Sequence, residues 1–212
     1  MTTEVIGSAT LYCGDAYEIV PECRFDSLVT DPPYGMKYQS GRRIVKYNKI
    51  KNDDSAAASV FAAGLHAPHS KYIFCRWDNL WFIPTPKSVI TWVKNNWSSG
   101  DLRHAHGRQT ELICFYPGPE HVFPGRRPAD VVYADRTGNQ HHPAEKPLAL
   151  MRTVLGWTAG AVIDPFMGSG TTGVAAVAAG REFVGIEIDA DYFDTACQRI
   201  EAVANQASLF SP

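Results

Sequence analysis

The sequence lacks a long hydrophobic run, a secretory signal and a marked excess of charge of either sign. Its apolar stretches fall well short of the ~18 uninterrupted residues that a membrane-spanning helix needs, so we expect no membrane span. The first ten residues, MTTEVIGSAT, have neither the basic nor the apolar region of a secretory signal. The net charge of −2 gives no overall indication of a nucleic-acid partner, so any such indication must come from local clusters.

Paired cysteines and metal-binding motifs are also missing. The five cysteines are odd in number and widely spaced, with no C-x-x-C pair. This argues against a disulfide framework or a zinc site and favours a reducing compartment, the cytoplasm. The seven histidines include the pairs His104–His106 and His141–His142, but no H-E-x-x-H pattern and no carboxylate at ligand spacing. We therefore expect no metal site.

The sequence does contain enough apolar material for one folded domain, residues 1–212. With 45% hydrophobic residues it is too apolar to be disordered. Short apolar runs alternate with helical stretches, which predicts an open α/β sheet, mostly parallel and covered on both faces. Predicted strands are 9–13, 27–31, 72–75, 88–94, 111–116, 161–164 and 181–188, and predicted helices are about 15–22, 54–65, 147–158, 171–180 and 191–205. The strands at 88–94 and 111–116 have no obvious helix between them and are expected to form an antiparallel edge.

Two segments break this alternation. Residues 35–52 hold six basic residues and no acidic one, with two tyrosines interleaved. This segment is either a solvated loop or a nucleic-acid contact, and the tyrosines between the basic residues favour the contact. Its candidate DNA-binding residues are Lys37, Arg42, Arg43 and Lys46. The second segment, 117–145, is rich in Pro, Gly and His, so we expect a surface loop, and its Arg126 and Arg127 are further candidate DNA-binding residues.

A glycine-rich turn follows the apolar strand at 161–164. In AVIDPFMGSGTTG, the residues Gly168, Gly170 and Gly173 fit G-x-G-x-x-G, and Glu187 lies at the end of the next predicted strand. Such glycines let a ligand approach the backbone at a helix N-terminus, and the carboxylate can hold ribose hydroxyls. A nucleotide-type site is therefore predicted. Only 39 residues follow Gly173, too few for the units that follow this motif in a dehydrogenase.

A second motif, SLVTDPPYG at 27–35, also follows an apolar strand directly. Ligands of open α/β sheets bind at this end of the strands. Pro32 can offer only its carbonyl, so with the Asp31 carboxylate it makes a cluster of acceptors beside the Tyr34 ring. Such a cluster suits an exocyclic amino group on a flat base that stacks on the tyrosine.

The two motifs together resemble those of the S-adenosylmethionine-dependent DNA amino-methyltransferases. These enzymes methylate adenine N6 or cytosine N4 and carry a [DNS]-P-P-[YFW] motif. The order here, D-P-P-Y first and D-P-F-M-G-S-G-T-T later, is similar to the permuted beta class. The resemblance covers almost the whole chain, including ITWVKNN, TELICFYP and HPAEKPLALM. It implies a doubly wound, mostly parallel, seven-stranded Rossmann-like sheet with an antiparallel edge strand, circularly permuted.

The resemblance also implies roles for individual residues. Asp31, Pro32, Pro33 and Tyr34 would form the catalytic motif. Glu187 would hold the ribose of S-adenosylmethionine, Asp15 would reach its adenine unless it only caps the following helix, and Lys146 would approach its carboxylate end. The remaining cofactor-binding residues would be Asp164, Phe166, Gly168, Ser169, Gly170, Thr171 and Thr172.

The implied substrate is double-stranded DNA with the target base flipped into the D-P-P-Y pocket. In this family D-P-P-Y goes mostly with adenine N6, with cytosine N4 and an RNA adenine as alternatives. The recognition segment at 117–145 is very short, so we expect a short or relaxed recognition site. A homodimer is expected because it would double the positively charged surface. Two other classes remain open at this stage: a nicotinamide-dependent oxidoreductase, which the motif order disfavours, and a non-catalytic nucleic-acid-binding module.

Overall fold

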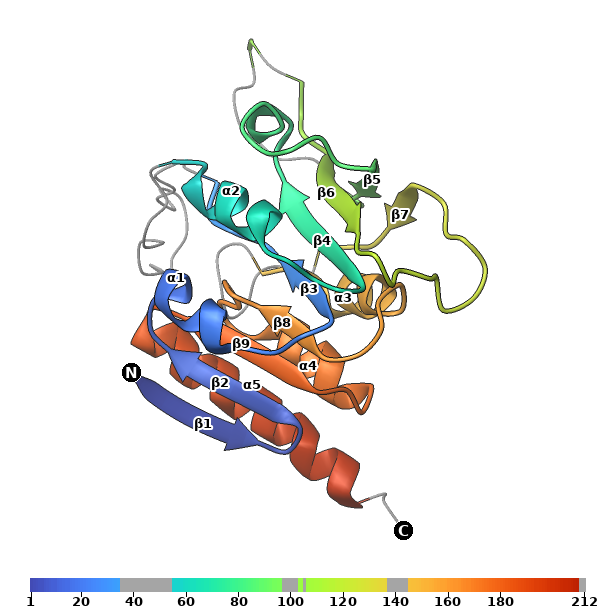
Figure 1. The fold of residues 1–212 in the computed structure, drawn as a ribbon. Helices are drawn as coiled ribbons and strands as arrows, with labels where there is room; N and C mark the ends of the chain where they lie inside the picture. The colour runs from blue at the N-terminus through green and yellow to red at the C-terminus, as the bar shows by residue number, and fades with distance from the viewer. Residues whose placement is uncertain (35–54, 97–102, 105, 137–144, 210–212) are drawn as a thin grey trace.

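A computed structural model describes residues 1–34, 55–96, 103–104, 106–136 and 145–209 of the chain. A single twisted sheet forms its centre, with helices on both faces (Figure 1). Within the described residues the sheet has nine strands in the order β1-β2-β9-β8-β3-β4-β6-β5-β7. The strands are β1 (Thr2–Ile6), β2 (Ala9–Cys13), β3 (Ser27–Thr30), β4 (Ser70–Cys75), β5 (Ser88–Val93), β6 (Thr110–Pro117), β7 (Val131–Tyr133), β8 (Val162–Asp164) and β9 (Phe183–Glu187).

The helices cover two apolar cores, one on each face of the sheet. Helices α3 (Leu148–Leu155), α4 (Thr171–Ala178) and α5 (Ala190–Leu209) pack on the first core, and α1 (Ala16–Ile19) and α2 (Ala57–Gly64) on the second. The 3₁₀ turns η1 (Val20–Glu22) and η2 (Trp77–Asn79) follow α1 and β4. Neighbouring strand residues point to opposite faces, so buried Val29 belongs to the first core and buried Leu28 to the second.

All seven predicted strands form, and two edge strands were missed. Four of the five β1 residues are exposed, so β1 carries no apolar pattern, and β7 has only three residues. The predicted antiparallel pairing of β5 with β6 is confirmed, but β6 lies between β4 and β5 and the edge strand is β7. No described helix combines the length and the apolar character that crossing a bilayer requires.

Strand direction decides which loops share an edge of the sheet. Within the described residues, every strand except β1 and β6 runs in the same direction. We call the edge where β2, β9, β8, β3 and β4 end the carboxyl edge. Antiparallel β6 starts there and ends at the opposite edge, where Pro117 pairs with Ser70.

Candidate functional site

The glycine turn lies at the carboxyl edge, between β8 and α4. Gly168 and Gly170 have φ values of 53° and 82°, a left-handed conformation that glycine adopts without strain. A Cβ on Gly170 would also come within 2.8 Å of the Ala196 Cβ. Gly173 serves packing, because a Cβ there would lie 2.6 Å from the Phe183 ring. The turn therefore needs its first two glycines for backbone shape and the third for contact between α4 and the sheet.

Asp164, the last residue of β8, holds the turn in place. Its carboxylate accepts hydrogen bonds from the Thr30 hydroxyl (2.7 Å), the Thr172 hydroxyl (2.6 Å) and the Phe166 N–H (3.1 Å). Burial raises the pKa of Asp164 to about 6, although these three donors act in the opposite direction. The bond to Thr30 joins the end of β8 to the residue that precedes Asp31.

Glu187 closes the other side of the turn from the end of β9. One of its carboxylate oxygens accepts from the Gly168 N–H at 2.9 Å and the other from the Asp189 N–H at 2.8 Å. Burial raises the pKa of Glu187 from its ordinary value of 4.5 to about 7. Asp15 reaches the same edge because Gly14 N–H bonds the Glu187 carbonyl, and its side chain caps α1 by accepting from the Tyr17 N–H at 2.9 Å.

Arg199 on α5 contacts the glycine turn, and this contact was not predicted from the sequence. Its guanidinium donates to the Ser169 carbonyl (2.6 Å), to the Ser169 hydroxyl (2.9 Å) and to the Thr171 hydroxyl (3.3 Å). It also pairs with Glu145 at 2.9 Å. The Ser169 and Thr171 side chains are thus tied to the last helix, and no local pattern around Arg199 indicated this.

The D-P-P-Y motif follows β3, beside the glycine turn. Tyr34 donates its hydroxyl proton to one oxygen of the Asp31 carboxylate, and the Lys146 ammonium donates to the other. Burial raises the pKa of Asp31, and the positive charge of Lys146 opposes this rise. The carboxylate is therefore held by two donors at the carboxyl edge, in a partly buried position.

Lys146 lies in this part of the site, and its predicted approach to the carboxylate end of the cofactor stays a prediction. Its Nζ contacts Asp31 and lies 3.3 Å from a Glu111 oxygen, and Glu111 also pairs with Lys94. Burial would lower the pKa of Lys146, but the two carboxylates outweigh burial and raise it. Asp31, Lys146, Glu111 and Lys94 thus form a chain of alternating charges, which we call the charge chain. Neither Glu111 nor Lys94 was predicted from the sequence.

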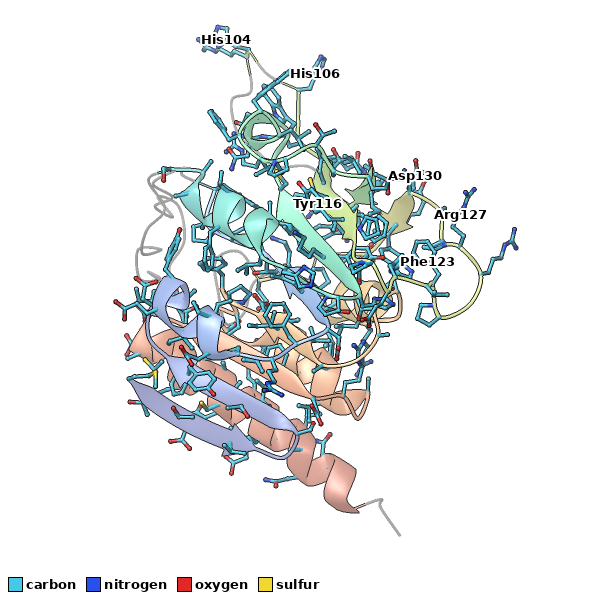
Figure 2. All side chains as sticks on the ribbon, viewed as in Figure 1. His104, His106, Tyr116, Phe123, Arg127 and Asp130 are labelled. Carbon is cyan, nitrogen blue, oxygen red and sulfur yellow. The ribbon has the colours of Figure 1, made fainter. Side chains whose placement is uncertain are left out.

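The predicted DNA-binding residues divide into two groups. Lys37, Arg42, Arg43 and Lys46 lie outside the described residues, although their segment begins directly after Tyr34. Arg126 and Arg127 are exposed in the loop that follows Pro117. Because β6 ends with Pro117 at the edge opposite to Asp31, this loop leaves the sheet at that edge. Figure 2 shows Arg127 on that loop, remote from His104 and His106.

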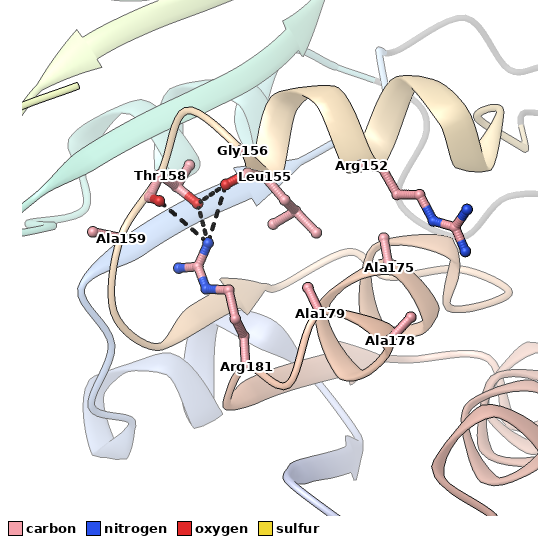
Figure 3. Close-up of a pocket in the computed structure, with 9 residues that line it drawn as sticks. All are labelled: Arg152, Leu155, Gly156, Thr158, Ala159, Ala175, Ala178, Ala179 and Arg181. Atoms are coloured by element: carbon pink, nitrogen blue, oxygen red, sulfur yellow. Dashed lines mark hydrogen bonds between the residues drawn. The ribbon is translucent and has the colours of Figure 1, made fainter. Parts of the chain in front are cut away.

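A hollow of about 470 Å³ lies between α3 and α4, before β8 and β9 begin (Figure 3). Arg181 projects into it and donates to the Leu155 carbonyl (3.1 Å), the Thr158 hydroxyl (2.6 Å) and the Gly160 carbonyl (3.0 Å). These bonds join the ends of two connecting loops. The hollow contains none of the motif residues and lies at the edge opposite to them, so we assign it to packing between the helices.

Comparison with known proteins agrees with the motif-based reading. The family model N6_N4_Mtase, described as DNA methylase, matches residues 127–198. "Putative methylase YubD" of Escherichia coli (strain K12) is 28% identical, over 90% of this chain and 89% of its own. "DNA adenine methyltransferase YhdJ" of the same organism is 36% identical over 32% of this chain and 24% of its own. The crystal structure of the M1.HpyAVI-SAM complex superposes with a TM-score of 0.68 and 28% identity, over 90% of this chain and 99% of that one.

Proposed function

We propose that the chain transfers a methyl group from S-adenosylmethionine to the exocyclic amino nitrogen, N6, of a flipped-out adenine in double-stranded DNA, and the match of residues 127–198 to the DNA methylase family supports this. The observation that carries this proposal is the hydrogen bond between Thr30 and Asp164. It joins the strand before the amino-group acceptors to the strand before the glycine turn. An acceptor for an amino group and a cradle for a nucleotide-like ligand therefore lie next to each other.

The residues at the carboxyl edge fit S-adenosylmethionine. Gly168 and Gly170 give the turn before α4 its left-handed backbone, and Glu187 offers a carboxylate suited to ribose hydroxyls. The acidic side chains Asp164 and Glu187 complement a positively charged sulfonium. When bound, the cofactor supplies an activated methyl group.

The chain contributes alignment and electrostatic stabilisation to the reaction. An adenine amino nitrogen is a poor nucleophile because its lone pair is delocalised into the ring. Hydrogen bonds from this amino group to the Asp31 carboxylate and the Pro32 carbonyl would favour its pyramidal form and stabilise the positive charge that develops on it. The charge of Lys146 favours the ionised form of Asp31, and the Tyr34 ring supplies a surface on which the base stacks. Alignment of the acceptor nitrogen with the methyl group supplies much of the remaining acceleration.

Analysis of the methylated product tests which base is methylated and whether the substrate is DNA or RNA. We expect labelled methyl to pass from S-adenosylmethionine to unmethylated duplex DNA and to appear as N6-methyladenine after digestion to nucleosides. N4-methylcytosine as the product would overturn the choice of adenine and keep the reaction class. Methylation of RNA alone would overturn the DNA substrate, and no transfer to either would overturn the proposed function.

Changing both Arg42 and Arg43 to alanine is expected to weaken duplex binding on all sequences. Each arginine that contacts a phosphate adds about 0.9 to the slope of log K against log salt, so the slope should fall by up to about two. The matched control changes Arg126 and Arg127 to alanine, because their loop leaves the sheet at the opposite edge. This control should leave the duplex affinity and the salt slope near the parental values. Affinities measured at several salt concentrations check this, and equal effects of the two pairs would contradict it.

The affinity for S-adenosylmethionine is expected to rise with pH up to about 7. The ribose hydroxyls donate to the ionised Glu187, whose pKa burial raises to about 7, so below that pH binding must displace a proton. In Glu187→Gln the affinity should be lower and this part of its pH dependence should be gone. Calorimetric titration at about pH 5.5 and pH 8 gives both values. If Glu187→Gln keeps the parental pH dependence, then the pH dependence of cofactor affinity comes from another group, such as Asp164.

The raised pKa of Glu187 also affects the stability of the folded protein without bound cofactor. Because the folded protein binds the Glu187 proton more tightly than the unfolded chain, stability falls between about pH 4.5 and 7 and stays lower above. Glu187→Gln should reduce this loss, which thermal unfolding across the range measures.

A further inference from the structure

The segment that joins β4 to β5 exposes three large aromatic side chains. Trp77, Trp81 and Phe82 have 63%, 84% and 64% of their surface exposed, and we call them the aromatic patch. Single exposed apolar residues are common on protein surfaces, but three aromatic rings within six residues are a concentration that usually marks an interaction site. Neither the glycine turn nor the charge chain uses these rings.

The aromatic patch sits on a backbone that is held firmly. The Asn79 N–H bonds the Arg76 carbonyl and the Phe82 N–H bonds the Asn79 carbonyl, both at 3.1 Å. Ile83 is buried in the second core, and partly buried Leu80 packs against that core. Because inward anchors alternate with outward rings, the rings are presented by an ordered turn, and binding through them costs little conformational entropy.

The aromatic patch is next to the D-P-P-Y motif. The Asn79 side chain donates a hydrogen bond to the Tyr34 carbonyl at 3.1 Å, which ties the turn to the catalytic motif. Exposed Arg103 and Arg108 lie in the loop between β5 and β6, which leaves the sheet at the same edge. Figure 2 labels His104 and His106 of this loop at the end of the molecule where the β4–β5 segment also lies. Rings and cationic side chains thus occur together at the carboxyl edge.

We propose that the aromatic patch stacks on unpaired bases of the DNA strand beside the target nucleotide, with the phosphates of that strand near Arg103 and Arg108. Extruding a base unstacks its neighbours, and aromatic side chains bind exposed base faces regardless of sequence. A second copy of the chain is a poorer occupant, because covering this turn would obstruct the edge through which DNA reaches Asp31. The proposal rests on the proposed function for the identity of the strand.

The test compares a mixed-sequence single-stranded oligodeoxynucleotide with an abasic strand of the same length. The parent is expected to bind the base-bearing strand roughly tenfold more tightly, the scale of stacking on an aromatic side chain. The variant with both Trp77→Ala and Trp81→Ala should lose this preference and keep the salt dependence of the parent. Trp81→Phe retains a ring and should keep most of it. Val122→Ala, an exposed apolar truncation in the loop at the opposite edge, is the matched control and should change nothing.

Methyl transfer to duplex DNA, measured in parallel, separates this proposal from the proposed function. If the parent transfers methyl and the double variant keeps its preference for the base-bearing strand, the proposed role of the aromatic patch is wrong and the proposed function stands. A parent that transfers no methyl but loses its base preference with the tryptophans supports the patch and overturns the enzyme assignment. If the double variant instead converts a dimer to a monomer with unchanged DNA binding, the patch is a contact between copies and the proposal is wrong.

Discussion

Asp31→Ala is expected to lower methyl transfer by a factor on the order of a hundred or more at saturating cofactor and DNA, the scale for removing one preorganised electrostatic partner. The carboxylate acts once the target amino group is in the pocket, as an acceptor that stabilises the charge developing on nitrogen. The glycine turn and Glu187 lie on other strands, so the affinity for S-adenosylmethionine should stay within a few-fold of the parent.

The charge chain requires a control for this experiment, because removing Asp31 leaves Lys146 buried with Glu111 as its carboxylate partner. Asp31→Asn keeps the shape and should also lose activity, and thermal unfolding reports any loss of fold in either variant. Near-parental turnover of Asp31→Ala would contradict the assignment of D-P-P-Y. Glu187→Ala should do the reverse of Asp31→Ala, weakening cofactor binding and slowing turnover mainly at low cofactor concentration.

Lys146→Met is expected to lower turnover at neutral pH at least tenfold and to move the acid side of the pH–rate profile upward. Burial already raises the pKa of Asp31, and Lys146 provides the nearest opposing charge, while Glu111 raises the pKa further. Without Lys146, more of Asp31 is protonated at neutral pH and cannot accept from the amino group. Activity should therefore recover as the pH rises, and a series of turnover measurements from acid to alkaline pH shows this.

Cofactor affinity separates the two positions considered for Lys146. The contact with Asp31 predicts that Lys146→Met binds S-adenosylmethionine within a few-fold of the parent. A loss of cofactor affinity with an unchanged pH profile would favour the position implied by the family resemblance. Lys146→Arg retains the charge and should keep more activity than the methionine variant, which tests whether charge or only volume matters at this position.

The sequence by itself determined those features that depend on a few neighbouring residues. The strand at 27–31 was predicted because a short run around Leu28 and Val29 ends at a Pro-Pro turn, and β3 is buried at all four positions. The turn at Gly168 and Gly170 was predicted because left-handed backbone favours glycine, and both residues adopt it. Glu187 was expected at the end of its strand, and β9 ends there.

The tertiary structure alone decided which distant residues meet. Glu111 and Lys146 are far apart in the chain, and they come together because β6 is inserted antiparallel between β4 and β5, which brings the start of β6 to the carboxyl edge. The same insertion sends the loop with Arg126 and Arg127 to the opposite edge. Local periodicity and backbone preference indicate which segments form strands, helices and turns. The order and direction of strands depend on how whole faces pack together, and this no single segment encodes.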